Sequence, residues 1–132
     1  MRPATYPKLC GALGAQWAVL VTTFAQTDPA APSRVPGWTV ADLERHVSQT
    51  GQSLGALADG PPADGLVTGL REWADALPGI SDRIAERVRN DPAPPLADMA
   101  PSTLAALNVA DPSMPVAQLT GTHLLILSLI HI

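Results

Sequence analysis

Three histidines and one cysteine are the side chains of this 132-residue sequence that are best suited to metal binding or nucleophilic chemistry. His46 lies within the segment PGWTVADLERHV, whose pattern is typical of an amphipathic helix. His123 and His131 lie near the C-terminus, and Cys10 lies among apolar residues near the N-terminus. A metal site requires several ligands that facing elements bring to one point. His46 therefore matters for function only if other donors face it.

The charge and cysteine content narrow the classes of function. Charged residues make up 15% of the chain, its formal net charge is −4, and lysine and arginine form no cluster, which opposes binding to nucleic acid. A single cysteine cannot form an internal disulfide, and this fits a reducing cytoplasm. Cys10 has no neighbouring histidine or charge cluster to activate its thiol. We therefore interpret it as a buried, unreactive side chain.

The segment that carries His46 predicts a helix from Thr39 to about Ala58. Thr39 can cap free backbone N–H groups, and Asp42 adds a carboxylate at the positive end of the helix. His46 lies at the edge of the apolar stripe, and Thr50 follows on the same face. On periodicity alone, a hydrogen-bonded core histidine is the simpler interpretation and a metal ligand is the alternative. The stripe consists of Val40, Leu43, Val47, Leu54 and Leu57.

Other periodic segments predict the elements that must position this histidine. No segment alternates with period two, so the pattern favours an all-α bundle of about four helices. The proline-rich segments TDPAAPSRVPG and DPAPPLADMAPS are expected to be irregular connectors. Charged side chains on two helices, including Glu44, Arg45 and Arg87, are interpreted as solvated surface. The expected helices cover residues 5–26, 39–58, a third region over about 66–77 and 80–90 that Pro78-Gly79 breaks, and 114–125.

Both ends of the chain are apolar enough to imitate membrane or targeting signals. The N-terminal segment could be an export signal, but its apolar residues recur at helical spacing, which favours a core helix. The C-terminal segment HLLILSLIHI is too short to span a bilayer. The apolar stripe of the N-terminal helix consists of Leu9, Leu13, Trp17, Leu20, Val21 and Phe24.

The segment VPGWTVADLERHV resembles the helix-two signature of the mycothiol-dependent maleylpyruvate isomerase family, in its N-terminal metal-binding domain. The first helix with Tyr6 and Trp17, the DGPPADG loop and the REWADALPGI stretch are similar as well. The resemblance implies a DinB-like four-helix bundle, here with an incomplete last helix. It also implies three ligands for a divalent metal, often zinc, and His46 matches the first of them. The metal would activate the thiol of mycothiol toward a small organic substrate.

The resemblance places the other two ligands on the last helix, as a Glu and a His four residues later. This chain has Ile126 and Ile130 at those positions, and neither can bind a metal. His131 is one residue out of register, and His123 lies seven residues before the expected histidine. The terminal LSLIHI resembles translated sequencing-adapter DNA. We therefore expect a DinB-like domain over residues 5–125 and a non-native tail over 126–132.

The sequence thus predicts a metal-binding domain of a mycothiol-dependent isomerase or thiol-transferase-like enzyme, located in the cytoplasm. Its partners would be a small-molecule thiol and a small organic substrate, with no nucleic acid and no membrane. As written, the chain is expected to be inactive, and no residue is assigned a catalytic role. A non-catalytic helical module for interaction or regulation is the alternative, with LLILSLI as its partner surface. An exported or membrane-associated small protein is a third reading, which rests on the two apolar ends.

Overall fold

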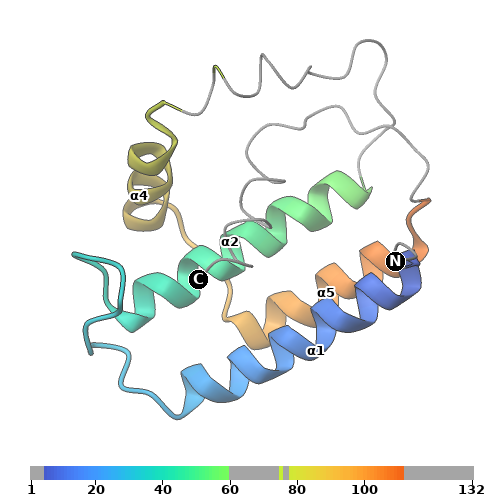
Figure 1. The fold of residues 1–132 in the computed structure, drawn as a ribbon, viewed down its shortest axis with the longest axis horizontal. Helices are drawn as coiled ribbons and strands as arrows, with labels where there is room; N and C mark the ends of the chain where they lie inside the picture. The colour runs from blue at the N-terminus through green and yellow to red at the C-terminus, as the bar shows by residue number, and fades with distance from the viewer. Residues whose placement is uncertain (1–4, 60–74, 76–77, 112–132) are drawn as a thin grey trace.

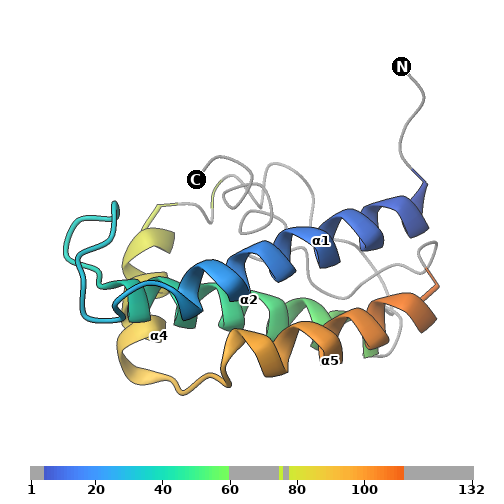
Figure 2. The same cartoon turned by 90° about the horizontal axis from the view of Figure 1, so that it is seen from below.

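The computed structural model describes residues 5–59, 75 and 78–111 of the chain. These residues form four α-helices and no strand, which confirms the predicted all-α fold (Figure 1). α1, α2 and α5 lie side by side, with α5 packed against both of the others, while α4 packs against α2 (Figure 2). The helices are α1 (Tyr6–Ala25), α2 (Val40–Asp59), α4 (Ile80–Asn90) and α5 (Leu96–Val109).

The connector between α1 and α2 folds back on itself and delivers Trp38 to the start of α2. The Ser33 N–H donates to the Trp38 carbonyl at 2.8 Å, and the Val40 N–H donates to the Ala31 carbonyl at 2.9 Å. The turn passes through Gly37, whose φ of +82° is a conformation that favours glycine. The sequence Pro-Gly-Trp-Thr therefore forms a tight turn followed directly by a helix start.

The predicted cap of α2 is confirmed. The Thr39 Oγ1 accepts a hydrogen bond from the Asp42 N–H at 3.2 Å, and Asp42 Oδ2 accepts one from the Thr39 N–H at 2.9 Å. This reciprocal pair satisfies backbone donors that the first turn of a helix otherwise leaves free. It fixes the first residue of α2, and therefore the direction in which each later residue of the helix points.

The core lies where α5 crosses α1 and α2. Gly51 and Gly55 of α2 allow this close approach, because a Cβ at Gly51 would overlap the Sδ and Cε of Met99. A Cβ at Gly55 would lie 3.1 Å from the Oγ1 of Thr103, which donates to the Gly51 carbonyl at 3.0 Å. The buried core residues are Trp17, Val47, Leu96, Met99 and Ala100.

One predicted connector is wrong, because most of the segment DPAPPLADMAPS is helical. α5 begins at Leu96 and continues through Pro101, which is exposed. A proline in a helix interior costs about 3 kcal/mol. Burial of each large apolar side chain, such as Leu96 and Met99, returns about 1.5–3 kcal/mol. Burial therefore outweighs the local preference. The buried residues of α5 are Leu96, Met99, Ala100, Thr103 and Leu107.

The other predicted elements have different outcomes. α1 and α4 match the expected helices over 5–26 and 80–90. Most of the stripe of α1 packs on the core, but Leu9 is 55% exposed, so its assignment to that face was wrong. By length and composition α1 could cross a membrane, a property shared by core helices and signal sequences. The expected helix over 114–125 and most of the one over 66–77 lie outside the described residues, as does the boundary at 125.

Candidate metal site around His46

His46 lies in the second turn of α2 and is buried, with 6% of its surface exposed. Its ring meets that of Trp38 edge to face, with the ring centroids 5.4 Å apart and an angle of 75° between the planes. The turn at Gly37 and the cap at Thr39 place Trp38 within reach of a side chain two helical turns further on. Trp38 is thus a packing anchor, and the ring that it packs against is that of His46.

The surroundings of His46 favour its neutral form. Burial lowers the pKa of the imidazole below its usual 6.5, and the positive charge of Arg87 lowers it further. At neutral pH the ring therefore carries a free nitrogen lone pair, which is the form that binds a metal. The hydroxyl of Thr50 donates to the backbone carbonyl of His46 at 2.9 Å, not to the ring.

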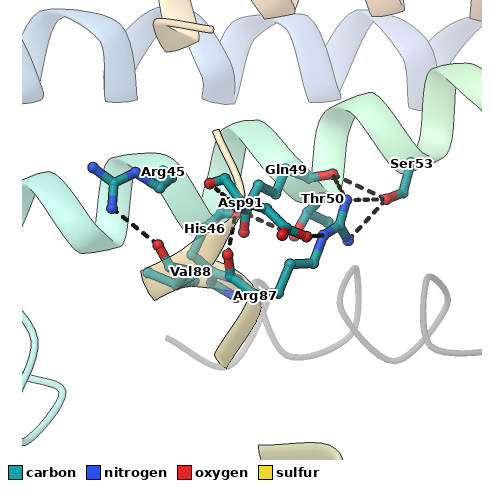
Figure 3. Close-up of polar contacts among 8 residues, drawn as sticks. All are labelled: Arg45, His46, Gln49, Thr50, Ser53, Arg87, Val88 and Asp91. Carbon is teal, nitrogen blue, oxygen red and sulfur yellow. Dashed lines mark hydrogen bonds and ion pairs between the residues drawn. The ribbon is translucent and has the colours of Figure 1, made fainter. Parts of the chain in front are cut away.

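The Arg87 side chain reaches from α4 to α2 and is still 40% exposed, so its interpretation as solvated surface is only partly correct. Its Nη1 and Nη2 each donate to the Ser53 Oγ at 3.1 Å, and Nη2 also approaches the Gln49 carbonyl at 3.4 Å (Figure 3). An ion pair with Asp91 is longer, at 3.9 Å between Nε and Oδ2. A long arginine side chain can reach across a helix surface that its Cα position alone would leave solvated.

Gln49 joins the same two helices with its amide. The Nε2 donates to the Arg87 and Asp91 carbonyls, both at 3.0 Å (Figure 3). Both carbonyls lie at the C-terminal end of α4, where the Arg87 carbonyl also accepts the Asp91 N–H at 2.9 Å. The two bonds fix the amide orientation and leave the Oε1 buried without a hydrogen-bond partner among the described residues.

Two further charged side chains of α2, interpreted as solvated, are partly exposed and also contact neighbouring backbone. The Arg45 Nη1 donates to the Val88 carbonyl at 2.9 Å, and the Glu44 Oε1 accepts from the Leu96 N–H at 3.3 Å. Both side chains satisfy backbone groups at helix ends, where partners are scarce. α2 therefore holds the end of α4 and the start of α5 through polar contacts.

Ser48 and Gln49 are buried polar residues that were not predicted from the sequence. Ser48 is fully buried and donates to the Pro94 carbonyl at 2.6 Å, and Gln49 is 2% exposed. Helical periodicity assigns one face to the core, whereas the middle of α2 has neighbours on all sides. The absence of charge over residues 46–51 was the one available sign that this turn is enclosed.

Comparison with known families identifies the domain. Residues 10–127 match the family described as the mycothiol maleylpyruvate isomerase N-terminal domain. The chain belongs to this family. No curated protein and no solved structure matches it. The resemblance carried by the Pro-Gly-Trp-Thr-Val segment is thus confirmed, and the helical bundle is that of a mycothiol-related isomerase family domain.

Among the described residues of this domain, the predicted ligand His46 is buried, its pKa is lowered, and its ring contacts Trp38. No group of three or more His, Cys, Asp or Glu side chains that could hold a metal occurs among residues 5–59, 75 and 78–111. His123 and His131 lie outside that part of the chain, as do Ile126 and Ile130. Cys10 is buried, as expected, and belongs to no such group.

Proposed function

We propose that this chain is the metal-binding domain of a mycothiol-dependent isomerase or thiol-transferase-like enzyme, and that His46 is one ligand of a divalent metal, with zinc the expected ion. The family match supports the mycothiol-related assignment. The observation that carries the role of His46 is its burial as a neutral imidazole, within the segment that identifies the family. Its single cysteine, Cys10, is consistent with work in a reducing cytoplasm.

In this proposal, the residues around His46 prepare the ring for coordination. Trp38 fixes its plane, and burial together with Arg87 keeps a lone pair available at neutral pH. When bound, a divalent metal would turn a coordinated thiol into a thiolate, the nucleophile for a small organic substrate. The capping pair at Thr39 and Asp42 fixes the start of α2, and this fixes the direction in which the His46 side chain points.

We further propose that this chain does not catalyse the family reaction. Its residues 126 and 130 are isoleucines, where the family resemblance requires a Glu and a His. One imidazole is an incomplete set, because a catalytic zinc takes three protein ligands. Restoration of the missing pair should therefore create a metal site that depends on His46.

The test is zinc content in the variant that carries Ile126→Glu and Ile130→His. We expect about one zinc per chain after purification and dialysis. The further substitution His46→Ala should remove it, whereas His123→Ala, the matched control, should leave it bound. Circular dichroism at each step checks that the helices are retained. Zinc retained in the His46→Ala protein would exclude His46 as a ligand, and absence of zinc from the restored protein would contradict the proposed function.

A non-catalytic interaction module is the second candidate, and the exposed face of α1 favours it. Leu9 and Val19 are 55% and 60% exposed, so this helix presents large apolar side chains to its surroundings. If this second function is correct, the protein restored with Ile126→Glu and Ile130→His should contain no zinc. It should also show self-association in analytical ultracentrifugation that Leu9→Ser and Val19→Ser weaken together.

A further inference from the structure

Polar side chains attach α4 to α2. The Arg45 Nη1 donates to the Val88 carbonyl, and the Gln49 Nε2 donates to two carbonyls at the C-terminal end of α4 (Figure 3). In the opposite direction, the Arg87 guanidinium donates to the Ser53 Oγ. The three contributors from α2 follow one another at intervals of four residues, so they lie on one face of that helix. We call Arg45, Gln49, Ser53 and Arg87 the polar clamp.

Apolar burial adds little to this attachment. Among the described residues of α4, Val88 is the one fully buried side chain, and Ile80 and Ile84 are partly buried. α5, in contrast, has buried side chains along its length, from Leu96 to Leu107. Water replaces the hydrogen bonds of the polar clamp when α4 leaves, whereas exposed apolar surface has no such compensation. α4 is therefore held less firmly than α5.

α4 is also too short to remain helical by itself. It has 11 residues, and isolated helices shorter than about 12–15 residues are marginal in water. Release from α2 would therefore unfold α4 and expose its backbone amides. α1, α2 and α5 would keep their shared core, to which Trp17, Val47 and Met99 contribute and Val88 does not. A segment with these properties opens locally, without unfolding of the whole domain.

The polar clamp lies beside His46. Seven residues separate His46 from Ser53, which is close to two helical turns, so the two side chains leave α2 in nearly the same direction. Burial and, after it, the charge of Arg87 lower the pKa of the imidazole, as expected for a guanidinium on the same face. With α4 in place, His46 is 6% exposed. α4 therefore covers the face of α2 that carries this ring.

We propose that α4 is a lid, which leaves α2 by local unfolding while α1, α2 and α5 stay packed, and that this opening exposes His46 to solvent. The opening is a property of the metal-free chain, because it depends on the polar clamp and on Val88 alone. Its use as the entrance to a metal site at His46 rests on the proposed function. The polar clamp thus sets how often the lid opens.

Native-state hydrogen exchange of the metal-free full chain tests the opening. Amides of α4 should exchange at least about tenfold faster than those of α5, and with a weaker dependence on urea, because little surface is exposed. Gln49→Ala, which removes two bonds of the polar clamp, should speed exchange in α4 by about a further tenfold. Gln52→Ala, the same change at an exposed position of α2, should alter it by less than about twofold.

Tyr6→Phe separates a local opening from global unfolding. It removes the bond from the Tyr6 hydroxyl to the Leu107 carbonyl, which joins α1 to α5 and stays intact when α4 opens. It should therefore speed exchange in α5 by about tenfold and leave exchange in α4 unchanged. Equal acceleration of both helices by Tyr6→Phe would overturn the proposal, and so would an equal urea dependence of both in the wild-type chain. The wild-type comparison decides the matter even if Gln49→Ala fails to fold.

Reaction with diethyl pyrocarbonate, a reagent for neutral imidazole, tests the exposure of His46. Mass spectrometry of the digested chain should show that His46 is modified about tenfold faster in Gln49→Ala and at the wild-type rate in Gln52→Ala. An unchanged rate in Gln49→Ala would overturn the role of α4 as a lid over this ring. Because neither experiment contains metal, their failure is distinct from failure of the zinc experiment. Zinc bound by a restored protein whose α4 opens only by global unfolding would retain the metal site and reject the lid.

Discussion

Replacement of Gly51 by alanine probes the packing that fixes α2, the helix that carries His46. An alanine in a helix interior is more favourable than glycine by about 1 kcal/mol. At Gly51, however, the new Cβ would overlap the Sδ and Cε of Met99, which is 2% exposed, so this side chain would have to repack within the core. Overpacking of this kind costs about 1–3 kcal/mol. Gly51→Ala should therefore lower the free energy of unfolding by up to about 2 kcal/mol.

Gly11→Ala on α1 is the matched control, because nothing lies within 4 Å of the added Cβ. It should raise the free energy of unfolding by up to about 1 kcal/mol, so the two variants should differ by about 1–3 kcal/mol. Urea unfolding followed by circular dichroism measures both. Met99→Ala should also cost less in the Gly51→Ala background than alone, because the overlapping atoms are gone. A Gly51→Ala protein as stable as Gly11→Ala would refute the close approach of α5 to α2.

The remaining predictions concern the start and the centre of α2. Because the pKa of His46 is lowered in the folded chain, its contribution to stability is complete above about pH 6.5 and is lost as the pH falls below that value. Urea unfolding of the metal-free chain between pH 7.5 and 5 should show this loss. His46→Leu should reduce the dependence of the free energy of unfolding on pH, and an unchanged pH dependence would contradict the prediction. Thr39→Ala should cost about 1 kcal/mol through loss of the cap. The Thr39 N–H lowers the pKa of Asp42 below 3.8, so Asp42→Asn should destabilise the chain at pH 7, and this loss should shrink as the pH falls below 3.8; a loss that does not change with pH would contradict the prediction.

The features that the sequence predicted correctly are those determined by short-range chemistry. The Thr39–Asp42 cap follows from residues three apart, and its geometry is the same in any helix that begins there. Similarly, the inward position of His46 follows from its spacing to Val47 and Leu43 along one helix. The family assignment was accessible for the same reason, because its signature is a continuous segment at the start of α2.

The features that the sequence did not predict depend on contacts between different helices of the bundle. Pro101 disfavours a helix and therefore predicted a connector. The burial of the opposite face of α5 outweighs this local preference. The contact of Arg87 with Ser53 depends on the position of α4 relative to α2, which no local pattern specifies. The unpaired Oε1 of Gln49 likewise has no counterpart in the sequence. Long-range packing therefore decides the surroundings of His46, although its inward direction is local.

Nitrogen NMR of the His46 imidazole during zinc titration tests the central claim most directly. In the protein restored with Ile126→Glu and Ile130→His, the account predicts that one ring nitrogen of His46 changes its chemical shift in proportion to zinc, up to about one equivalent. The same ring in the unrestored chain should respond far less, since a single imidazole is an incomplete site. If zinc binds to the restored protein while both ring nitrogens of His46 keep their shifts, the histidine is a core residue and not a ligand.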